Sequence, residues 1–195
     1  MARPRTFDPE LAMQEAMEAF WERGYNATSV SDLLTEMKLN RGSLYGTFGD
    51  KKQLFLAALE RYAAQGFDAL QEILDQPGSA KANLREWVRT VSQTCIGEAG
   101  KRGCLVAKAA MELAPFDEEI AQWVRKLHLR HERAVAEVIR RGQKSGEINR
   151  DLAPTAAARF LLSSMGGLRL MGSISPCEKD VREVVELVLK VLDER

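Results

Sequence analysis

The sequence predicts an all-α protein in which a small N-terminal headpiece of three helices is joined by one long helix to a larger helical domain. Apolar residues recur at helical spacing along almost the whole chain, and capping residues divide this pattern into segments. No alternating apolar run bounded by hairpin turns indicates a strand. With 195 residues, 45% of them hydrophobic and 29% charged, the chain has the composition of an ordinary globular protein.

The first predicted helix spans residues 9–23. Asp8 is placed to cap it and Pro9 to occupy its first position, while Gly24 ends it. Its apolar stripe should pack inside the headpiece. The residues of this stripe are Leu11, Ala12, Ala16, Ala19 and Phe20.

Two short helices follow. Ser29, or Thr28 beside it, is expected to cap the first of them, and Ser29 with Asp32 has the spacing of a capping box. Asn40 is expected to cap the second, which spans residues 41–48, because its side-chain oxygen can accept from first-turn N–H groups that lack a partner within the helix.

The helix at residues 41–48 has an unusual outward face. Leu44 and Phe48 share one side and should face the core, which leaves Gly42 and Gly46 pointing outward. A glycine inside a helix costs roughly 1 kcal/mol relative to alanine, so this helix either frays or lets something approach its backbone closely. The polar side chains around the glycines can contact bases or phosphates, which favours a helix in the DNA major groove. They are Asn40, Arg41, Ser43, Tyr45, Thr47 and Lys51.

The positive charge of the chain is local. The formal net charge is zero, so the composition as a whole gives no basic signal for nucleic acid. Residues 38–52, however, hold four Lys or Arg residues against one acid, Asp50. Arg3 and Arg5 add two cations in an N-terminal arm, which is either a disordered terminus or a contact to phosphates or the minor groove.

One set of residues extends over the first quarter of the chain: Gly24-Tyr25, Thr28, Leu33, Gly42, Leu44-Tyr45, Phe48, Lys51 and Leu54-Phe55. Together they resemble the helix-turn-helix signature of the TetR-type bacterial transcriptional regulators. That family often has His or Tyr just before the phenylalanine, whereas this chain has Thr47. An aromatic phosphate contact therefore does not carry over to this position.

The resemblance implies a helix-turn-helix DNA-binding domain at residues 1–50 and a helical ligand-binding and dimerisation domain at residues 51–195. Base contacts are expected from Arg41, Ser43, Tyr45 and Thr47. Phosphate contacts are expected from Thr28, Ser29, Tyr45 and Lys51. The same interface includes Asn40, Gly42 and Gly46.

Beyond the headpiece the pattern predicts one long helix and then five more. The long helix runs from Lys51 for about 24 residues, with Asp50 expected to cap it and Gln53 at the reciprocal position. Gly66 is a candidate bend, and the helix ends before the turn at residues 76–79. The later helices are predicted at residues 80–96, 103–113, 117–142, 154–171 and 177–192, with a loop at 142–153.

The last two predicted helices carry so many apolar residues that they either fill a core or form a seam between subunits. Ser163, Ser164, Gly166 and Gly167 would let another helix approach closely. In TetR-type regulators the last two helices form a four-helix dimer interface. The resemblance therefore implies a homodimer and, by symmetry, a palindromic double-stranded DNA operator.

Three cysteines, at positions 95, 104 and 177, lack C-x-x-C spacing and indicate reduced thiols. Cys104 falls at a predicted helix N-terminus near Lys101, Arg102 and Lys108, so it is either a small buried hydrophobe or a reactive thiol. Its Gly-Cys-Leu context is similar to that of TetR-type repressors in which a cysteine senses electrophiles or oxidants.

The middle helices are expected to hold an unknown small-molecule effector. Each candidate lining residue is either a ligand contact or plain core. The candidates are Trp87, Cys104, Met111, Trp123, Leu127 and Phe160.

Several other classes are disfavoured. No apolar run reaches the length of a membrane span and no apolar leader is present, so we expect a cytoplasmic protein without membrane association. His128 and His131 lack a third ligand, so we expect no metal. Without a P-loop, a dinucleotide-binding glycine pattern or a G-x-S-x-G motif, we expect neither a cofactor nor an enzyme.

These observations predict a homodimeric DNA-binding transcriptional regulator, most often a repressor in such a family, that a small-molecule or thiol-reactive effector releases from its operator. Two other classes remain open. One is a DNA-bound protein of the same fold that recruits a protein partner, and the other is a helical ligand-binding protein without DNA binding. Intact Arg41, Tyr45 and Lys51 argue against the second.

Overall fold

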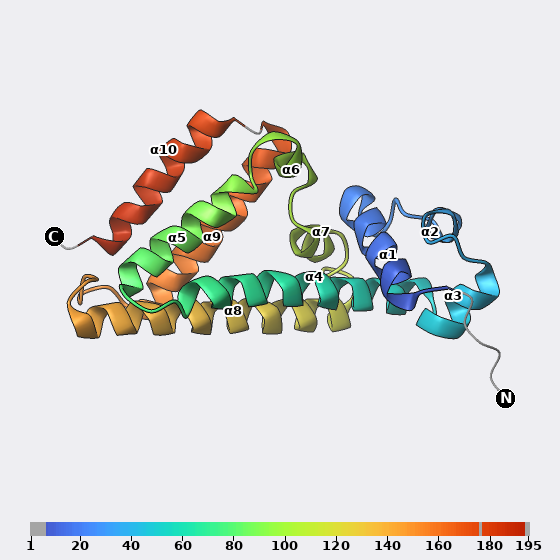
Figure 1. The fold of residues 1–195 in the computed structure, drawn as a ribbon, viewed down its shortest axis with the longest axis horizontal. Coiled ribbons are helices and arrows are strands. Elements are labelled where there is room, and N and C mark those ends of the chain that lie inside the picture. The colour runs from blue at the N-terminus through green and yellow to red at the C-terminus, as the bar shows by residue number, and fades with distance from the viewer. Residues whose placement is uncertain (1–6, 176, 194–195) are drawn as a thin grey trace.

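The computed structural model describes residues 7–175 and 177–193, and these residues form helices and connecting loops without a strand (Figure 1). The all-α prediction is confirmed. Arg3 and Arg5 of the N-terminal arm lie outside the described residues. The helices are α1 (Pro9–Arg23), α2 (Val30–Glu36), α3 (Arg41–Phe48), α4 (Lys51–Leu74), α5 (Ala80–Gln93), α6 (Gly97–Arg102), α7 (Leu105–Glu112), α8 (Glu118–Ser145), α9 (Pro154–Ile174) and α10 (Glu178–Leu189), followed by a 3-10 turn at Lys190–Leu192.

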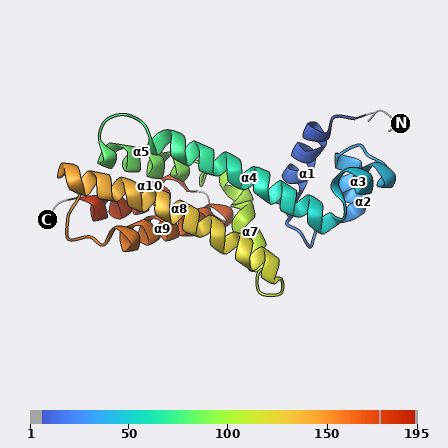
Figure 2. The same cartoon turned by 90° about the horizontal axis from the view of Figure 1, so that it is seen from below.

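The molecule is elongated, with the headpiece at one end (Figures 1 and 2). Helices α1, α2 and α3 pack around the first half of α4 and form this headpiece. In the body, α4 and α8 lie side by side, and α5 and α9 pack against α8. Helix α10 covers the outer side of α5 and α9.

Each helix of the headpiece begins at the predicted cap. Asp8 caps α1, Ser29 and Asp32 form the capping box of α2, and Asn40 caps α3. Asp50 caps α4: its carboxylate accepts from the backbone N–H of Gln53, and the side-chain oxygen of Gln53 accepts in return from the backbone N–H of Asp50, which completes a capping box. Local side-chain hydrogen bonds therefore fix where these helices start.

The headpiece core is built around α4. Phe20 of α1, Leu33 of α2 and Leu44 of α3 are buried against Leu54 and Phe55 of α4. The rings of Phe20 and Phe55 meet edge to face with their centroids 4.9 Å apart, a favoured geometry for aromatic pairs.

Helix α4 is one uninterrupted helix of 24 residues that takes part in two cores. Its N-terminal half is buried in the headpiece, whereas Phe67, Leu70 and Leu74 belong to the core of the body. Gly66 lies between these two sets without breaking the helix. The domain boundary after residue 50 stays a prediction, since α4 belongs to both units.

The body differs from the prediction at some helix ends. Helix α5 ends at Gln93, and the short helix α6 after it was not predicted, because six residues are too few to show a helical period. Helix α8 continues through Gly142, which is buried so tightly that an ideal Cβ would lie 2.5 Å from Cδ1 of Ile148. Gly146, with φ of 80°, ends the helix instead.

Helix α9 extends to Ile174, three residues beyond the predicted end at residue 171. It runs against α8 along much of its length. Within residues 7–175 and 177–193, no helix combines the length and the apolar content that a membrane span requires.

Candidate nucleic-acid interface and ligand cavity

The outward face of α3 lies at the end of the molecule. Leu44 is fully buried beneath this helix, whereas Arg41, Gly42, Tyr45 and Gly46 are exposed. An ideal Cβ built on Gly46 would meet no atom within 4 Å. No neighbour within the described chain therefore requires a glycine there, and the open backbone leaves room for a partner to approach.

The turn between α2 and α3 sets the position of this face. Lys38 adopts φ of 54°, which is uncommon for a residue other than glycine. The side-chain oxygen of Asn40 accepts from the backbone N–H of Ser43 at 2.9 Å and fixes the first turn of α3. Ser43 and Thr47 are half-buried, whereas the side chains of Arg41 and Tyr45 are exposed on this face.

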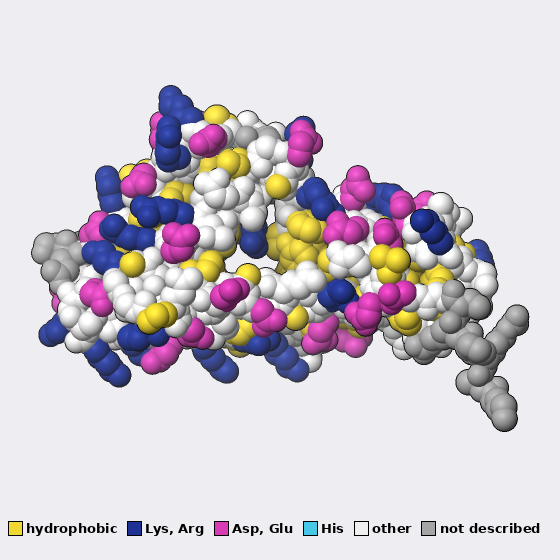
Figure 3. Space-filling view, viewed as in Figure 1, with side chains coloured by type: hydrophobic (Ala, Val, Ile, Leu, Met, Phe, Trp, Pro, Cys, Tyr) yellow, Lys and Arg dark blue, Asp and Glu magenta, His cyan; other side chains and the backbone are white. Residues whose placement is uncertain are grey.

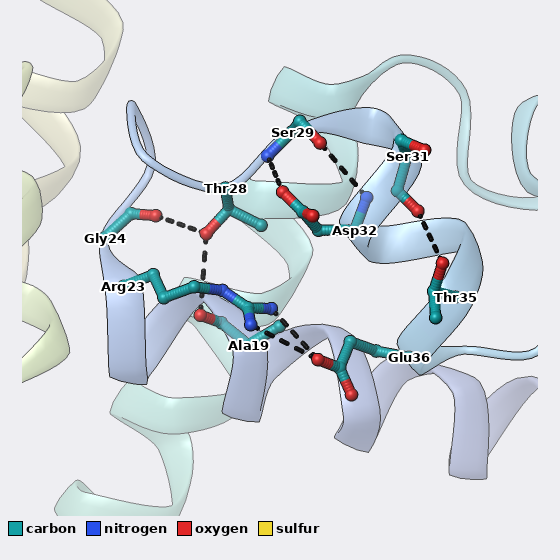
Figure 4. A network of polar contacts seen from close by, with 9 residues as sticks. All are labelled: Ala19, Arg23, Gly24, Thr28, Ser29, Ser31, Asp32, Thr35 and Glu36. Carbon is teal, nitrogen blue, oxygen red and sulfur yellow. Dashed lines mark hydrogen bonds and ion pairs between the residues drawn. The ribbon is translucent and has the colours of Figure 1, made fainter.

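Thr28 is not on the surface. Its side chain is fully buried, and its hydroxyl donates to the carbonyl of Gly24 at 2.6 Å, with the carbonyl of Ala19 at 3.5 Å (Figure 4). This burial corrects the prediction that Thr28 contacts a phosphate. The hydroxyl already has its partner inside the headpiece, where it ties the loop before α2 to the end of α1.

Ser29 is exposed at the N-terminus of α2. Its hydroxyl oxygen accepts from the backbone N–H of Asp32 at 3.1 Å, while the Asp32 carboxylate accepts from the N–H of Ser29 at 2.8 Å (Figure 4). Hydrogen bonding to the Ser29 side chain lowers the pKa of Asp32. An ion pair between Arg23 and Glu36 at 3.2 Å also joins α1 to α2.

Two adjacent lysines at the start of α4 have different surroundings. The ammonium of Lys51 lies 4.1 Å from the ring centroid of Tyr25, and burial lowers its pKa. The ammonium of Lys52 pairs instead with Asp117 at 2.7 Å and Glu119 at 2.9 Å. From the sequence, both lysines were expected to add positive charge to the DNA-binding surface, but acids at the start of α8 neutralise the charge of Lys52.

A cavity of about 760 Å³ lies between α4, α5, α7, α8 and α9. Figure 3 shows a hollow at the middle of the molecule, with hydrophobic side chains gathered on the side towards the headpiece. Four of the predicted lining residues border the cavity. They are Trp87, Cys104, Met111 and Leu127.

Trp123 and Phe160 do not line the cavity. Trp123 packs against the headpiece core, and Phe160 is 47% exposed on α9. The prediction of ligand contacts from these two residues is therefore wrong. The helical period placed them on apolar faces, but it does not say which neighbour each face meets.

Cys104 is the N-cap residue of α7 and opens on the cavity. Its sulfur lies 3.7 Å from Nη1 of Arg169. The phenol of Tyr62 lies against the same sulfur, and burial, reinforced by Cys104, raises the pKa of this phenol. Cys95 is fully buried instead, and burial raises the pKa of its thiol.

Two family models match the chain: "Bacterial regulatory proteins, tetR family" at residues 12–58, and "Tetracyclin repressor-like, C-terminal domain" at residues 74–188. The HTH-type transcriptional regulator YezE of Bacillus subtilis (strain 168) is 31% identical over 194 residues, which cover 99% of this chain and 100% of YezE. The chain belongs to the TetR family.

Other TetR-family relatives agree. The HTH-type transcriptional repressor ComR of Escherichia coli (strain K12) is 29% identical over 170 residues, covering 86% of this chain and 80% of ComR. A solved structure of a cysteine mutant of the TetR-family regulator CifR, complexed with 26-bp double-strand operator DNA, has a TM-score of 0.88 and 30% identity, covering 98% of this chain and 100% of the CifR chain. The present protein is thus a DNA-binding transcriptional regulator and not an enzyme.

The two histidines of this TetR-family protein border the cavity. Nδ1 of His131 lies 2.9 Å from the carbonyl oxygen of Leu127, and burial lowers the pKa of this imidazole, which disfavours its charged form. In the part of the chain that the structure describes, no three His, Cys, Asp or Glu side chains come close enough together to hold a metal ion, so neither histidine belongs to such a group.

Helix α7 forms a wall of the cavity and also holds the headpiece. The ammonium of Lys108 donates to the carbonyls of Trp21 at 2.7 Å and Glu22 at 3.0 Å, near the C-terminus of α1. Four residues on, the carboxylate of Glu112 accepts from the backbone N–H of Asn26 at 3.2 Å. Both contacts bind α7 to the backbone that leads from α1 to α2.

The segment just before α7 makes two further contacts with α1. The indole N–H of Trp21 donates to the carbonyl of Gly103 at 3.0 Å, and Arg102 pairs with Glu18. Cys104 therefore borders the cavity and directly follows two residues that contact α1. Sequence reasoning missed these contacts, because more than 80 residues separate the partners and no local pattern links them.

Tyr62 and Arg169 were also missed as neighbours of Cys104. They lie on α4 and α9, whereas the cysteine starts α7. The sequence signal was that Arg169, like Arg159, interrupts a largely apolar helix, which indicates a charge with a specific environment.

Proposed function

We propose that this protein is a homodimeric cytoplasmic repressor that binds a palindromic operator and releases it when a small molecule occupies the cavity beside Cys104. One observation carries the proposal: α7 borders the cavity and is also hydrogen-bonded to the end of α1. A ligand that displaces α7 must therefore disturb the headpiece. The relatives support the rest, since ComR is named a repressor and CifR was solved with operator DNA.

The DNA contacts are assigned from exposure. Arg41 and Tyr45 project from α3 into solvent and would reach base edges, with Ser43 and Thr47 at the sides of the same face. Ser29, Tyr45 and Lys51 would reach phosphates. Asn40 uses only its side-chain oxygen for the cap, so its amide N–H groups stay available to DNA.

The contrast between Lys51 and Lys52 gives a test of the phosphate contacts. Lys51→Ala should weaken binding to all DNA sequences alike and lower the slope of log affinity against log salt by about one unit, as for one lost phosphate contact. Lys52→Ala is the matched control and should leave the slope unchanged, because Asp117 and Glu119 already neutralise Lys52. Equal slopes for the two variants would remove Lys51 from the interface.

The dimer is assigned to α9 and α10. Phe160, Met171 and Ile174 are exposed on one side of α9, with Gly167 between them at helical spacing. Leu187 of α10 is 64% exposed. Exposed apolar side chains at helical spacing along α9 favour an association surface, and a second copy of the same surface would cover them by two-fold symmetry.

Alkylation of Cys104 tests the proposed control of operator binding. Iodoacetamide should modify Cys104 before Cys95, because Cys104 opens on the cavity whereas Cys95 is buried with a raised thiol pKa. The adduct adds bulk at the start of α7, and operator affinity should fall by roughly 5- to 150-fold, the usual range of coupling between sites. Adducts would be mapped by mass spectrometry and affinity measured by fluorescence anisotropy on the same samples.

A Cys104→Ser variant given the same treatment should keep its operator affinity. If this variant is released as fully as the wild type, or if Cys104 reacts slowly, the reactive-thiol mechanism is wrong. The effector would then be a reversibly bound small molecule, with Cys104 as one wall of its cavity.

Lys108→Met should weaken the coupling between the cavity and the headpiece. Alkylation of Cys104 in this variant should lower operator affinity by a smaller factor than in the wild type, because the hydrogen bonds to Trp21 and Glu22 are gone while the contacts of Gly103 and Glu112 remain. Lys101→Met is the control, since Lys101 is exposed and pairs with Glu98 on its own helix. If alkylation releases the operator equally from both variants, the coupling between the cavity and the headpiece does not run through Lys108.

Mapping of binding sites along the chromosome separates a repressor from the alternative of a DNA-bound protein that recruits a protein partner. We expect one or a few palindromic sites at promoters. Many scattered sites away from promoters would favour the alternative.

A further inference from the structure

The cavity beside Cys104 is positively charged on one side. Lys108 and Arg169 border it, and none of the described residues that line it is an aspartate or a glutamate. Burial lowers the pKa of His131, which disfavours its charged form. A cationic ligand would therefore meet only like charge, whereas an anion would meet opposite charge.

Lys108 and Arg169 differ in the hydrogen-bond partners that the protein already gives them. The ammonium of Lys108 is used by the carbonyls of Trp21 and Glu22. Arg169 is half-buried, and the structure gives it one hydrogen bond, from Nη1 to the sulfur of Cys104 at 3.7 Å. Among the described residues, no carboxylate lies within ion-pair distance of Arg169. A guanidinium presents five N–H donors, so most of them have no partner among the described residues.

The remaining walls are mostly apolar; besides Tyr62 and Cys104, the polar exceptions are Gln65, His128, His131 and Ser173. The apolar residues come from α4, α5, α8 and α9 and include Leu70, Trp87, Val91, Leu127, Leu162 and Met165. A volume of about 760 Å³ is within the range of small-molecule sites. The cavity therefore offers an apolar chamber with one unpaired cationic group.

We propose that the effector is an organic anion, with a carboxylate that pairs with Arg169 and an apolar body that fills the chamber. A planar carboxylate matches the fork of the guanidinium and satisfies two of its N–H groups at once. Partial burial strengthens this pairing relative to water, because Arg169 has lost part of its hydration without gaining an acid. The carboxylate would lie next to the sulfur of Cys104, at the start of α7.

The first test measures binding without DNA. Sodium octanoate, octan-1-ol and octylamine share one apolar tail, and the fluorescence of Trp21 and Trp87, which line the cavity, reports their binding. Octanoate should bind about ten-fold tighter than the alcohol, and the amine should bind most weakly. Equal affinities of octanoate and octan-1-ol would overturn the proposal.

Two variants test whether Arg169 causes the preference for octanoate over octan-1-ol. In Arg169→Met, octanoate should bind no better than octan-1-ol, while the affinity for the alcohol stays near that of the wild type. Arg125→Met is the control, because Arg125 is exposed on α8 outside the cavity. A preference for octanoate that survives in Arg169→Met would overturn the assignment to Arg169.

A second readout needs no variant. Iodoacetate carries a carboxylate where iodoacetamide carries a neutral amide. Both reagents alkylate Cys104 by the same reaction: the sulfur bonds to the CH2 carbon, iodide leaves, and the thiol proton passes to solvent. The rate ratio of iodoacetate to iodoacetamide at Cys104 should exceed the ratio for free glutathione by about ten-fold. A ratio no larger than that of glutathione would contradict an anion site beside the sulfur.

This inference rests on the proposed function, in which the cavity is the effector site, but the two can fail separately. If octanoate binds through Arg169 and the operator complex stays intact at saturation, the anion site stands and the proposed control of DNA binding fails. If octanoate and octan-1-ol bind alike and both release the operator, the control stands and the anion site fails.

Discussion

Gly46→Leu should abolish specific operator binding while the protein stays folded. An added Cβ at this position meets no atom within 4 Å, and leucine is the better helix former by roughly 1 kcal/mol, so the variant should be as stable as the wild type or more so. On DNA, the new side chain would stand between α3 and the base edges. Losing one or two base contacts per half-site, at about 1–3 kcal/mol each, predicts a fall in affinity on the order of 100-fold or more.

Fluorescence anisotropy with operator DNA measures this loss, and thermal unfolding checks the fold. Gly46→Ala should give an intermediate loss, because a methyl group separates the surfaces less. Ala64→Leu, at an exposed position of α4, should bind like the wild type. If Gly46→Leu binds the operator normally, another face of the headpiece enters the groove.

Replacing Phe160 and Met171 together by glutamate should dissociate the proposed dimer. Both side chains are exposed on α9, at 47% and 44%, so the monomer tolerates the change. Across a two-fold axis, however, four carboxylates would be brought into one apolar seam. A monomer binds a single half-site, so operator affinity should fall by roughly 100- to 10,000-fold, the gain that linking two sites provides.

Sedimentation at micromolar concentration measures the oligomeric state, and anisotropy measures the operator affinity. Phe116→Glu is the control for adding charge at an exposed apolar position, because Phe116 is 89% exposed before α8 and away from α9. A wild-type protein that sediments as a monomer, or a double variant that stays dimeric, would exclude this seam.

The parts of the fold that the sequence predicted depend on neighbours along the chain. Asn40 and Asp50 cap helices through hydrogen bonds to residues three positions away, so the pattern alone reveals them. The outward position of Gly46 likewise follows from the helical period. These features would survive in almost any arrangement of the helices.

The parts that the sequence did not predict depend on which helices meet. Thr28 has a hydroxyl typical of phosphate ligands, but the end of α1 covers it. Lys52 counts as surface charge until the start of α8 is placed beside it. Trp123 and Phe160 have the right chemistry for a ligand chamber and lie outside it, because side-chain type does not determine the orientation of a helix relative to its neighbours.

The continuity of α4 has a mechanical consequence. A helix of 24 residues is roughly 36 Å long, and turning such a rod by about 5° displaces its far end by about 3 Å. Successive base pairs are about 3.4 Å apart along one strand. In a symmetric dimer both headpieces would swing, and their separation would change by up to about 6 Å against a half-site spacing of about 34–36 Å. Because α4 is continuous, a small rotation of its end in the body moves its end in the headpiece. In the proposed dimer, a ligand would therefore need to move the body only slightly to separate the two recognition helices from the spacing of successive major grooves.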